Sequence, residues 1–129
     1  MTAKKIRVVY KEPGKEAEIK TIPNDLDKFQ QMVEGYIETV TIPGDMRSPF
    51  EKTVIIICDE EGKLKHAAAN ILLMGDMIRG PVVFVGENKA GDDFGSLTEK
   101  DACMICEICK QVSMDRISDI GGRTNGRYN

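Results

Sequence analysis

The feature that most constrains the fold of this chain is an uninterrupted apolar run from Val54 to Cys58. A strand that is apolar at every position has no face to present to water, so both of its faces must be covered. The run is also far too short to cross a bilayer, which takes about 20 apolar residues in a helix. It therefore predicts a central strand in a sheet that is covered on both sides.

Other segments around this run carry strand signals, with no long helical crossovers between most of them. Pro13 and Gly14 are turn residues that separate the first two segments and predict a hairpin. Residues 36–42 alternate between two faces, and Glu38 shares a face with Val40. The predicted strands cover residues 6–10, 17–22, 36–42, 53–58 and 81–86.

One helix is predicted after the second strand. Asn24 is a suitable N-cap, and Gly35 is expected to end the helix as the residue after its C-cap. An apolar stripe runs along the helix at Leu26, Phe29, Met32 and Val33. We expect the following residues to be buried together in one core: Val54, Ile56, Val83, Val85, Leu26, Phe29 and Ile37.

A second helix is predicted near the C-terminus. Thr98 is a hydroxyl residue followed three positions later by Asp101, which is typical of a helix start, and the helix should continue to about Val112 or Ile117. We expect a short helix at 67–73, a turn-rich passage at 75–80 and a left-handed residue at Gly62.

This order of elements predicts an α+β fold, with a small mixed or antiparallel sheet, one helix in the N-terminal half and one C-terminal helix. The length of 129 residues fits one domain. We assign residues 1–117 to that domain. Residues 118–129 form a Gly/Arg tail, which we expect to be loose unless a partner or another subunit orders it.

Charge and composition exclude several classes of function. The formal net charge of −3 argues against non-specific nucleic-acid binding, which requires a basic surface. Neither a signal peptide nor a lipidation motif is recognisable, and no apolar run could span a membrane. We therefore expect a cytoplasmic protein that does not act at a membrane.

Cys103, Cys106 and Cys109 are the most conspicuous motif, because thiolates at this spacing can bind iron–sulfur clusters or zinc. The segment has helical periodicity, however, and free cysteines are among the most buried residues. We favour packed, metal-free thiols over a metal site, and we expect no cofactor. The expectation of no enzymatic activity rests partly on His66, the single histidine, which has no acidic or hydroxyl partner at motif spacing.

Several short stretches, in this order and spacing, resemble the family catalogued as domain of unknown function 3846 between about residues 6 and 101. They are Glu12-Pro13-Gly14-Lys15, Gly35-Tyr36-Ile37-Glu38, the segment 59–65, Asn70, the segment 78–86 and Ser96-Leu97-Thr98. The resemblance implies a small accessory protein of a bacterial phage or mobile element, and it implies no activity. Residues 45–52 lengthen a connection relative to that pattern, and the cysteine segment and the tail lie beyond it.

Two hypotheses of function follow. The first is a module that binds or sequesters a small anionic molecule, such as a nucleotide-type signal, and so counters host defence. Its candidate residues are Tyr36 as a stacking surface with the polar side chains Lys63, Lys65, Asn70 and Arg79, and the tail residues Arg123 and Arg127. A homo-oligomer is compatible with this hypothesis. The alternative is an inhibitor or adaptor that binds a host protein through an acidic surface that includes Asp92 and Asp93.

Overall fold

The main sheet is built around β7 (Val82–Glu87), which has a neighbouring strand on each side. The computed structural model describes residues 4–44, 48–73, 75–91 and 93–112. Within them a six-stranded antiparallel sheet has the order β2-β1-β7-β4-β3, and β8 also pairs with β7. The strands are β1 (Lys5–Lys11), β2 (Glu18–Pro23), β3 (Ile37–Ile42), β4 (Val54–Asp59) and β8 (Phe94–Gly95).

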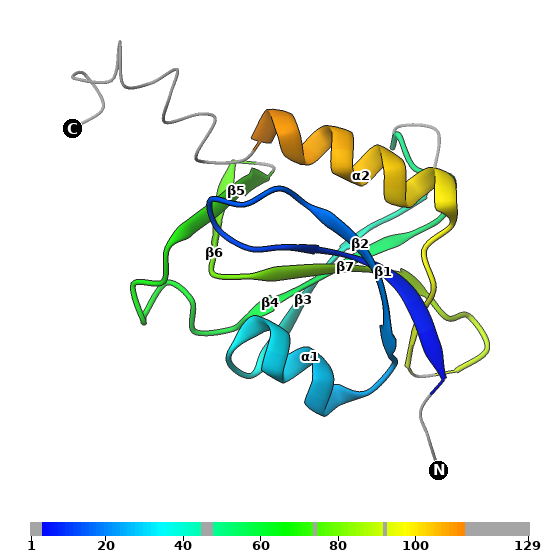
Figure 1. Cartoon of the computed structure of the whole chain (residues 1–129), viewed down its shortest axis with the longest axis horizontal. Helices are drawn as coiled ribbons and strands as arrows, with labels where there is room; N and C mark the ends of the chain where they lie inside the picture. The colour runs from blue at the N-terminus through cyan, green and yellow to red at the C-terminus, as the bar shows by residue number, and fades with distance from the viewer. Residues whose placement is uncertain (1–3, 45–47, 74, 92, 113–129) are drawn as a thin grey trace.

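The two faces of this sheet are covered by different elements (Figure 1). The helix α1 (Leu26–Val33) lies on one face. The opposite face carries the helix α2 (Glu99–Val112) and a separate hairpin of β5 (Ala69–Leu73) and β6 (Asp76–Arg79). The predicted α+β fold, with an antiparallel sheet and these two helices, is therefore confirmed.

Alternation along the strands divides the core into two clusters. On the α2 side, Val54 and Ile56 pack with Ile105 and other buried residues. On the α1 side, Phe29 packs with Val83 and Val85. The prediction of one common core was therefore wrong, because a sheet covered on both faces separates neighbouring residues. Leu26 is also 54% exposed, since it lies in the first turn of α1 and faces solvent.

The segment from 67 to 80 differs most from the sequence prediction, since it forms the β5–β6 hairpin instead of a helix and a turn. Short apolar runs are ambiguous between helix and strand when periodicity is the only guide. Ile71 and Ile78 pair across the hairpin and are both buried against the main sheet. Gly75, with φ of +80°, supplies the left-handed residue at the hairpin end.

Two local predictions were displaced by one or a few residues. Asp25, not Asn24, caps α1, because its carboxylate accepts from the amides of Asp27 and Lys28. The left-handed residue in the 60–66 turn is His66 (φ 55°) instead of Gly62. Gly35 follows the C-cap of α1 as predicted, and the left-handed residue there is the C-cap itself, Glu34 (φ 64°).

The start of α2 is as predicted. The Thr98 hydroxyl accepts from the Asp101 amide at 3.0 Å. The buried Asp101 carboxylate does not complete a reciprocal capping box; it accepts from the amides of Glu51 and Lys52 at 2.8 and 3.0 Å. Asp101 thereby ties the β3–β4 connection to α2. No helix in the described part of the chain has both the length and the apolar character needed to cross a membrane.

Candidate functional site

The site begins with Asp59, the last residue of β4. Its side chain is only 4% exposed, and its carboxylate accepts from the Glu61 amide and from Lys65 Nζ, each at 2.9 Å. A Cβ atom at Gly35 would lie 2.5 Å from Asp59 Oδ1, so the missing side chain at residue 35 makes room for this carboxylate. Asp59 therefore fixes the start of the 60–66 turn.

The turn then passes close to the hairpin. A Cβ atom at Gly62 would lie 2.8 Å from the carbonyl oxygen of Arg79 in β6, so only glycine allows this approach. Arg79 Nη1 donates to the carbonyl of Ala67 at 3.1 Å, and the Gly80 amide donates to the carbonyl of Ala68 at 2.8 Å. These bonds hold the turn against one end of the hairpin.

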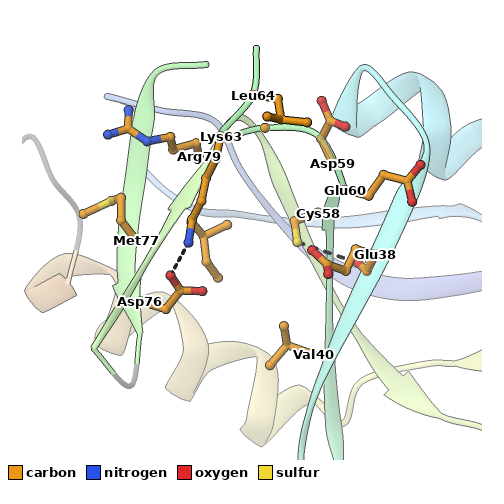
Figure 2. Close-up of a pocket in the computed structure, with 12 residues that line it drawn as sticks. Glu38, Val40, Cys58, Asp59, Glu60, Lys63, Leu64, Asp76, Met77 and Arg79 are labelled. Carbon is orange, nitrogen blue, oxygen red and sulfur yellow. Dashed lines mark hydrogen bonds and ion pairs between the residues drawn. The ribbon is translucent and has the colours of Figure 1, made fainter. Parts of the chain in front are cut away.

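A cleft of about 310 Å³ lies between the ends of β3 and β4, the 60–66 turn and β6 (Figure 2). We call it the β3–β6 cleft. Its apolar lining is Val40, Leu64, Met77 and Ile78, and Cys58 lies on the β3–β4 side. Its charged lining is Glu38, Asp59, Glu60, Lys63, Asp76 and Arg79.

Carboxylates outnumber cationic groups in this lining, four to two. Lys63 is already paired with Asp76 at 2.5 Å, and Arg79 extends away from the other labelled residues toward its Ala67 partner. Among the described residues, the carboxylates of Glu38 and Glu60 have neither an ion pair nor a hydrogen bond. Arg79 has no ion pair among the described residues either, so the unpaired groups of the lining are two carboxylates and one guanidinium, with a net negative charge.

Cys58 provides a chemical probe of this environment. Burial and, to a smaller extent, the nearby Glu38 and Asp59 carboxylates raise the pKa of its thiol to about 11. The thiol donates toward the carbonyl oxygen of Glu38, with Sγ 3.7 Å from that oxygen. At neutral pH this sulfur is protonated, and a thiol is a much weaker nucleophile than a thiolate.

Those sequence-predicted ligand residues that the structure describes do not form one site. Lys63 lines the β3–β6 cleft, whereas Lys65 lies beside Tyr36 in an open hollow of about 430 Å³ that also includes Gln30 and Gln31. The two lysines border different cavities because the segment is a turn, not an extended strand. Tyr36 is 67% exposed, as its proposed stacking role requires.

Asn70 has a structural position instead of a surface one. It is 0% exposed, and its amide nitrogen donates to the carbonyls of Lys11 and Gly80 at 2.9 and 2.8 Å. These bonds join the hairpin to β1. Arg123 and Arg127, the tail that contains them, and Asp92 lie outside the described residues. Asp93 accepts from the side-chain amides of Asn24 and Asn88.

The three cysteines lie on α2, as the helical periodicity predicts, but their surroundings differ. Cys103 is exposed, Cys106 is half-buried and Cys109 is buried. Burial raises the pKa of Cys109 to about 11. Within the ranges that the structure describes, no three histidine, cysteine, aspartate or glutamate residues gather as a metal site would require.

The residues that sequence analysis missed are the acidic ones in the cleft, Glu38, Glu60 and Asp76. Glu38 carried a signal, because it alternates in register with Val40 and Ile42, which pack toward the core. A carboxylate on the inner face of a strand is unusual. Asp76 carried none, because its segment was predicted to be a turn.

The comparisons with known proteins agree with the resemblance seen in the sequence. The family model described as Domain of unknown function (DUF3846) matches residues 6–112. The match includes α2 with Cys103, Cys106 and Cys109, so the expectation that this segment lies beyond the family was wrong. A search of the curated proteins found no match, and a search of the solved structures found none. By the extent of the family match, the chain is a member of the DUF3846 family.

Proposed function

We propose that this protein is a non-enzymatic binding module whose β3–β6 cleft takes a lysine or arginine side chain of a partner protein. The observation that carries this proposal is the pair of carboxylates, Glu38 and Glu60, that have no partner among the described residues. A cation that enters the cleft beside Glu38 is attracted by that carboxylate, and the exposed Glu60 adds negative charge at the rim. An anionic ligand at the same place is repelled.

The apolar part of the lining favours the same kind of ligand. Val40, Ile78 and the 78%-exposed Leu64 offer aliphatic surface beside the carboxylates. Lysine and arginine side chains combine a long aliphatic stem with a charged end, so they fit a cleft of mixed character. A small inorganic cation makes no use of the apolar surface.

Binding is better supported than catalysis. The Cys58 thiol is protonated at neutral pH, and His66 is exposed on the turn without lining the cleft. Within the part of the chain that the structure describes, neither group has a hydrogen-bonded acid or base of the kind that nucleophilic or acid–base catalysis requires.

Isothermal titration calorimetry with a short capped peptide of alternating lysine and valine tests this proposal. We expect affinity that falls with added salt, because the attraction is between charges near the surface. The double variant Glu38→Gln/Glu60→Gln should bind about tenfold more weakly, roughly 1.4 kcal/mol. Glu99→Gln/Glu107→Gln, which removes the same two charges on α2, is the matched control and should bind like the wild type. Equal affinities for all three proteins would refute the assignment.

The biological setting is also a proposal. We place the protein in the cytosol of a bacterial host, where it would serve a phage or mobile element by occupying a host protein involved in defence. The support for this setting is the sequence resemblance alone. Interaction with a host protein through acidic groups was the alternative hypothesis from the sequence, and the unpaired carboxylates favour it over an anionic ligand.

A nucleotide-type ligand is the second candidate, and one observation favours it. The exposed ring of Tyr36 lies in the same hollow as Lys65, with two glutamine side chains beside them. Lys65 is already paired with Asp59, so an anion must compete for it. A thermal-shift screen of cyclic and linear nucleotides tests this candidate, with Tyr36→Ala and Lys65→Ala as the sensitive variants. Lys63→Ala, on the other cavity, is the control that should respond like the wild type.

A further inference from the structure

The strand β3 forms one edge of the main sheet. Among the described residues it pairs with β4 alone, with Glu38 opposite Cys58 and Val40 opposite Ile56. The Glu60 amide donates to the Tyr36 carbonyl at 2.9 Å, so the backbone groups of Tyr36 point toward the β4 side. Inward-pointing and outward-pointing residues alternate along an antiparallel strand, so Glu38, Val40 and Ile42 also point toward β4. The amides and carbonyls of Ile37, Thr39 and Thr41 therefore point away from the sheet, toward the open edge.

This edge has few of the features that prevent strand addition, since Glu38 is the one charged residue in β3. Natural edge strands are commonly protected by lysine, proline or a bulge. The other edge, β2, has such features, since it contains Lys20 and ends at Pro23. The sequence of β3 is Ile-Glu-Thr-Val-Thr-Ile, without lysine, proline or glycine, and its register with β4 is regular. A second strand can therefore pair with β3 without displacing any part of the described chain.

The open edge is next to the β3–β6 cleft. Glu38 and Val40 belong to β3 and also line the cleft, so the two features share residues (Figure 2). Side chains of an added strand would alternate between the two faces of the sheet. Those on the α2 side would lie over the cleft and its unpaired carboxylates. Peptide recognition by strand addition uses this division, in which the backbone gives affinity and alternate side chains give specificity.

We propose that β3 accepts an extended basic segment of a partner protein as an additional strand, with a lysine or arginine side chain in the β3–β6 cleft. The inference rests on the proposed function, since it specifies how the partner of that cleft binds. Charge complementarity selects the occupant, because the cleft presents carboxylates that have no cation of their own. A second copy of the chain is a poorer occupant, because its own β3 would bring another Glu38 to the same edge.

Amide hydrogen exchange followed by NMR tests the strand addition, with the alternating lysine–valine peptide as the probe. In the free protein the amides of Glu38, Val40 and Ile42 should exchange slowly, and those of Ile37, Thr39 and Thr41 quickly. With the peptide at ten times its Kd, the second set should slow by about tenfold while the first changes little. The proposal would be overturned if both sets of amides exchange slowly in the peptide-free protein and its mass in solution is that of a dimer. That result would mean that a second copy of the chain covers the edge.

Variants at Thr39 give an independent test. Thr39→Pro removes an outward-pointing amide and no bond to β4, whereas Thr39→Val keeps the amide. We expect more than a tenfold loss of peptide affinity for the first variant and less than about a twofold change for the second. If Thr39→Pro does not fold, a peptide with N-methylated amides provides the same test on the wild type, and it should bind at least tenfold more weakly than the unmodified peptide.

The outcomes separate the two proposals. Peptide binding that depends on Glu38 and Glu60 but leaves exchange at Ile37, Thr39 and Thr41 unchanged would overturn strand addition and leave the cleft assignment intact. Failure of the peptide to bind at all would overturn both.

Discussion

Gly35 and Asp59 are expected to depend on each other, and the substitution Gly35→Ala tests that dependence. The new Cβ atom would lie 2.5, 2.6 and 2.8 Å from Oδ1, Cγ and Oδ2 of Asp59. Gly35 does not have a positive φ, so the substitution adds a steric conflict without backbone strain. The carboxylate cannot move aside without stretching its bonds to the Glu61 amide and Lys65 Nζ, both 2.9 Å long.

The magnitude follows from these contacts. Overpacking a well-filled site costs about 1–3 kcal/mol. Complete loss of a hydrogen bond to a charged group costs about 1.5–3 kcal/mol, and a weakened bond costs part of that. We therefore expect Gly35→Ala to lower the free energy of unfolding by about 2–4 kcal/mol. The same substitution should cost less than about 1 kcal/mol in an Asp59→Ala background, because the obstructing atoms are then absent.

Urea unfolding followed by circular dichroism, on the wild type, both single variants and the double variant, measures this coupling. Lys65→Ala is the comparison variant, since it removes one bond of the same carboxylate but leaves the obstructing Asp59 atoms in place. It should therefore reduce the cost of Gly35→Ala less than Asp59→Ala does. If the costs of Gly35→Ala and Asp59→Ala add to within about 0.5 kcal/mol, the two residues are not in contact and the account of the turn is refuted.

Three further predictions concern the core, the α2 cap and the buried thiols. Ile56 is fully buried, so Ile56→Ala should lower the free energy of unfolding by about 2–5 kcal/mol. Leu26 is exposed, so Leu26→Ala should change it by less than about 0.5 kcal/mol. Similar costs for the two variants would contradict the two-layer core. Asp101→Ala should cost about 2–4 kcal/mol by urea unfolding, because two amides lose a charged acceptor, and a cost below about 1 kcal/mol would show that the carboxylate does not hold the β3–β4 connection. The pKa values of the Cys58 and Cys109 thiols are raised in the folded protein, from 9.0 to about 11. Their contribution to the free energy of unfolding is therefore complete below pH 9.0 and is lost between pH 9.0 and about 11. The urea midpoint, measured in reductant, should therefore fall more steeply over that range in the wild type than in Cys109→Ala, and equal slopes would contradict the burial argument.

The strands of the central sheet were predictable because their signals are local. The apolar run at 54–58 and the segment at 81–86 need burial on both faces, and β4 and β7 indeed lie side by side in the middle of the sheet. The turn at Pro13-Gly14 and the helix start at Thr98 depend on residues a few positions apart. In such places a short segment contains all the interactions that determine its structure.

The hairpin and the cleft could not be predicted in the same way, because they depend on contacts between distant segments. From the sequence, Asn70 was expected at a binding surface. In the structure it is buried, because the Lys11 carbonyl of β1 accepts a hydrogen bond from it. Lys63 was expected to be available to an anion, but the hairpin places Asp76 beside it and the two form an ion pair. The negative charge of the cleft therefore depends on a pairing that neutralises Lys63, and a single sequence does not reveal that pairing.

The measurement that tests the central claim most directly is an NMR chemical-shift map of the isotope-labelled protein on addition of the alternating lysine–valine peptide. We expect the largest amide shifts along β3, from Ile37 to Ile42, and at Asp76 beside the β3–β6 cleft, and we expect them to diminish in the Glu38→Gln/Glu60→Gln variant. Shifts centred on Tyr36 and Lys65 or on α2, or no shifts at all, would contradict it.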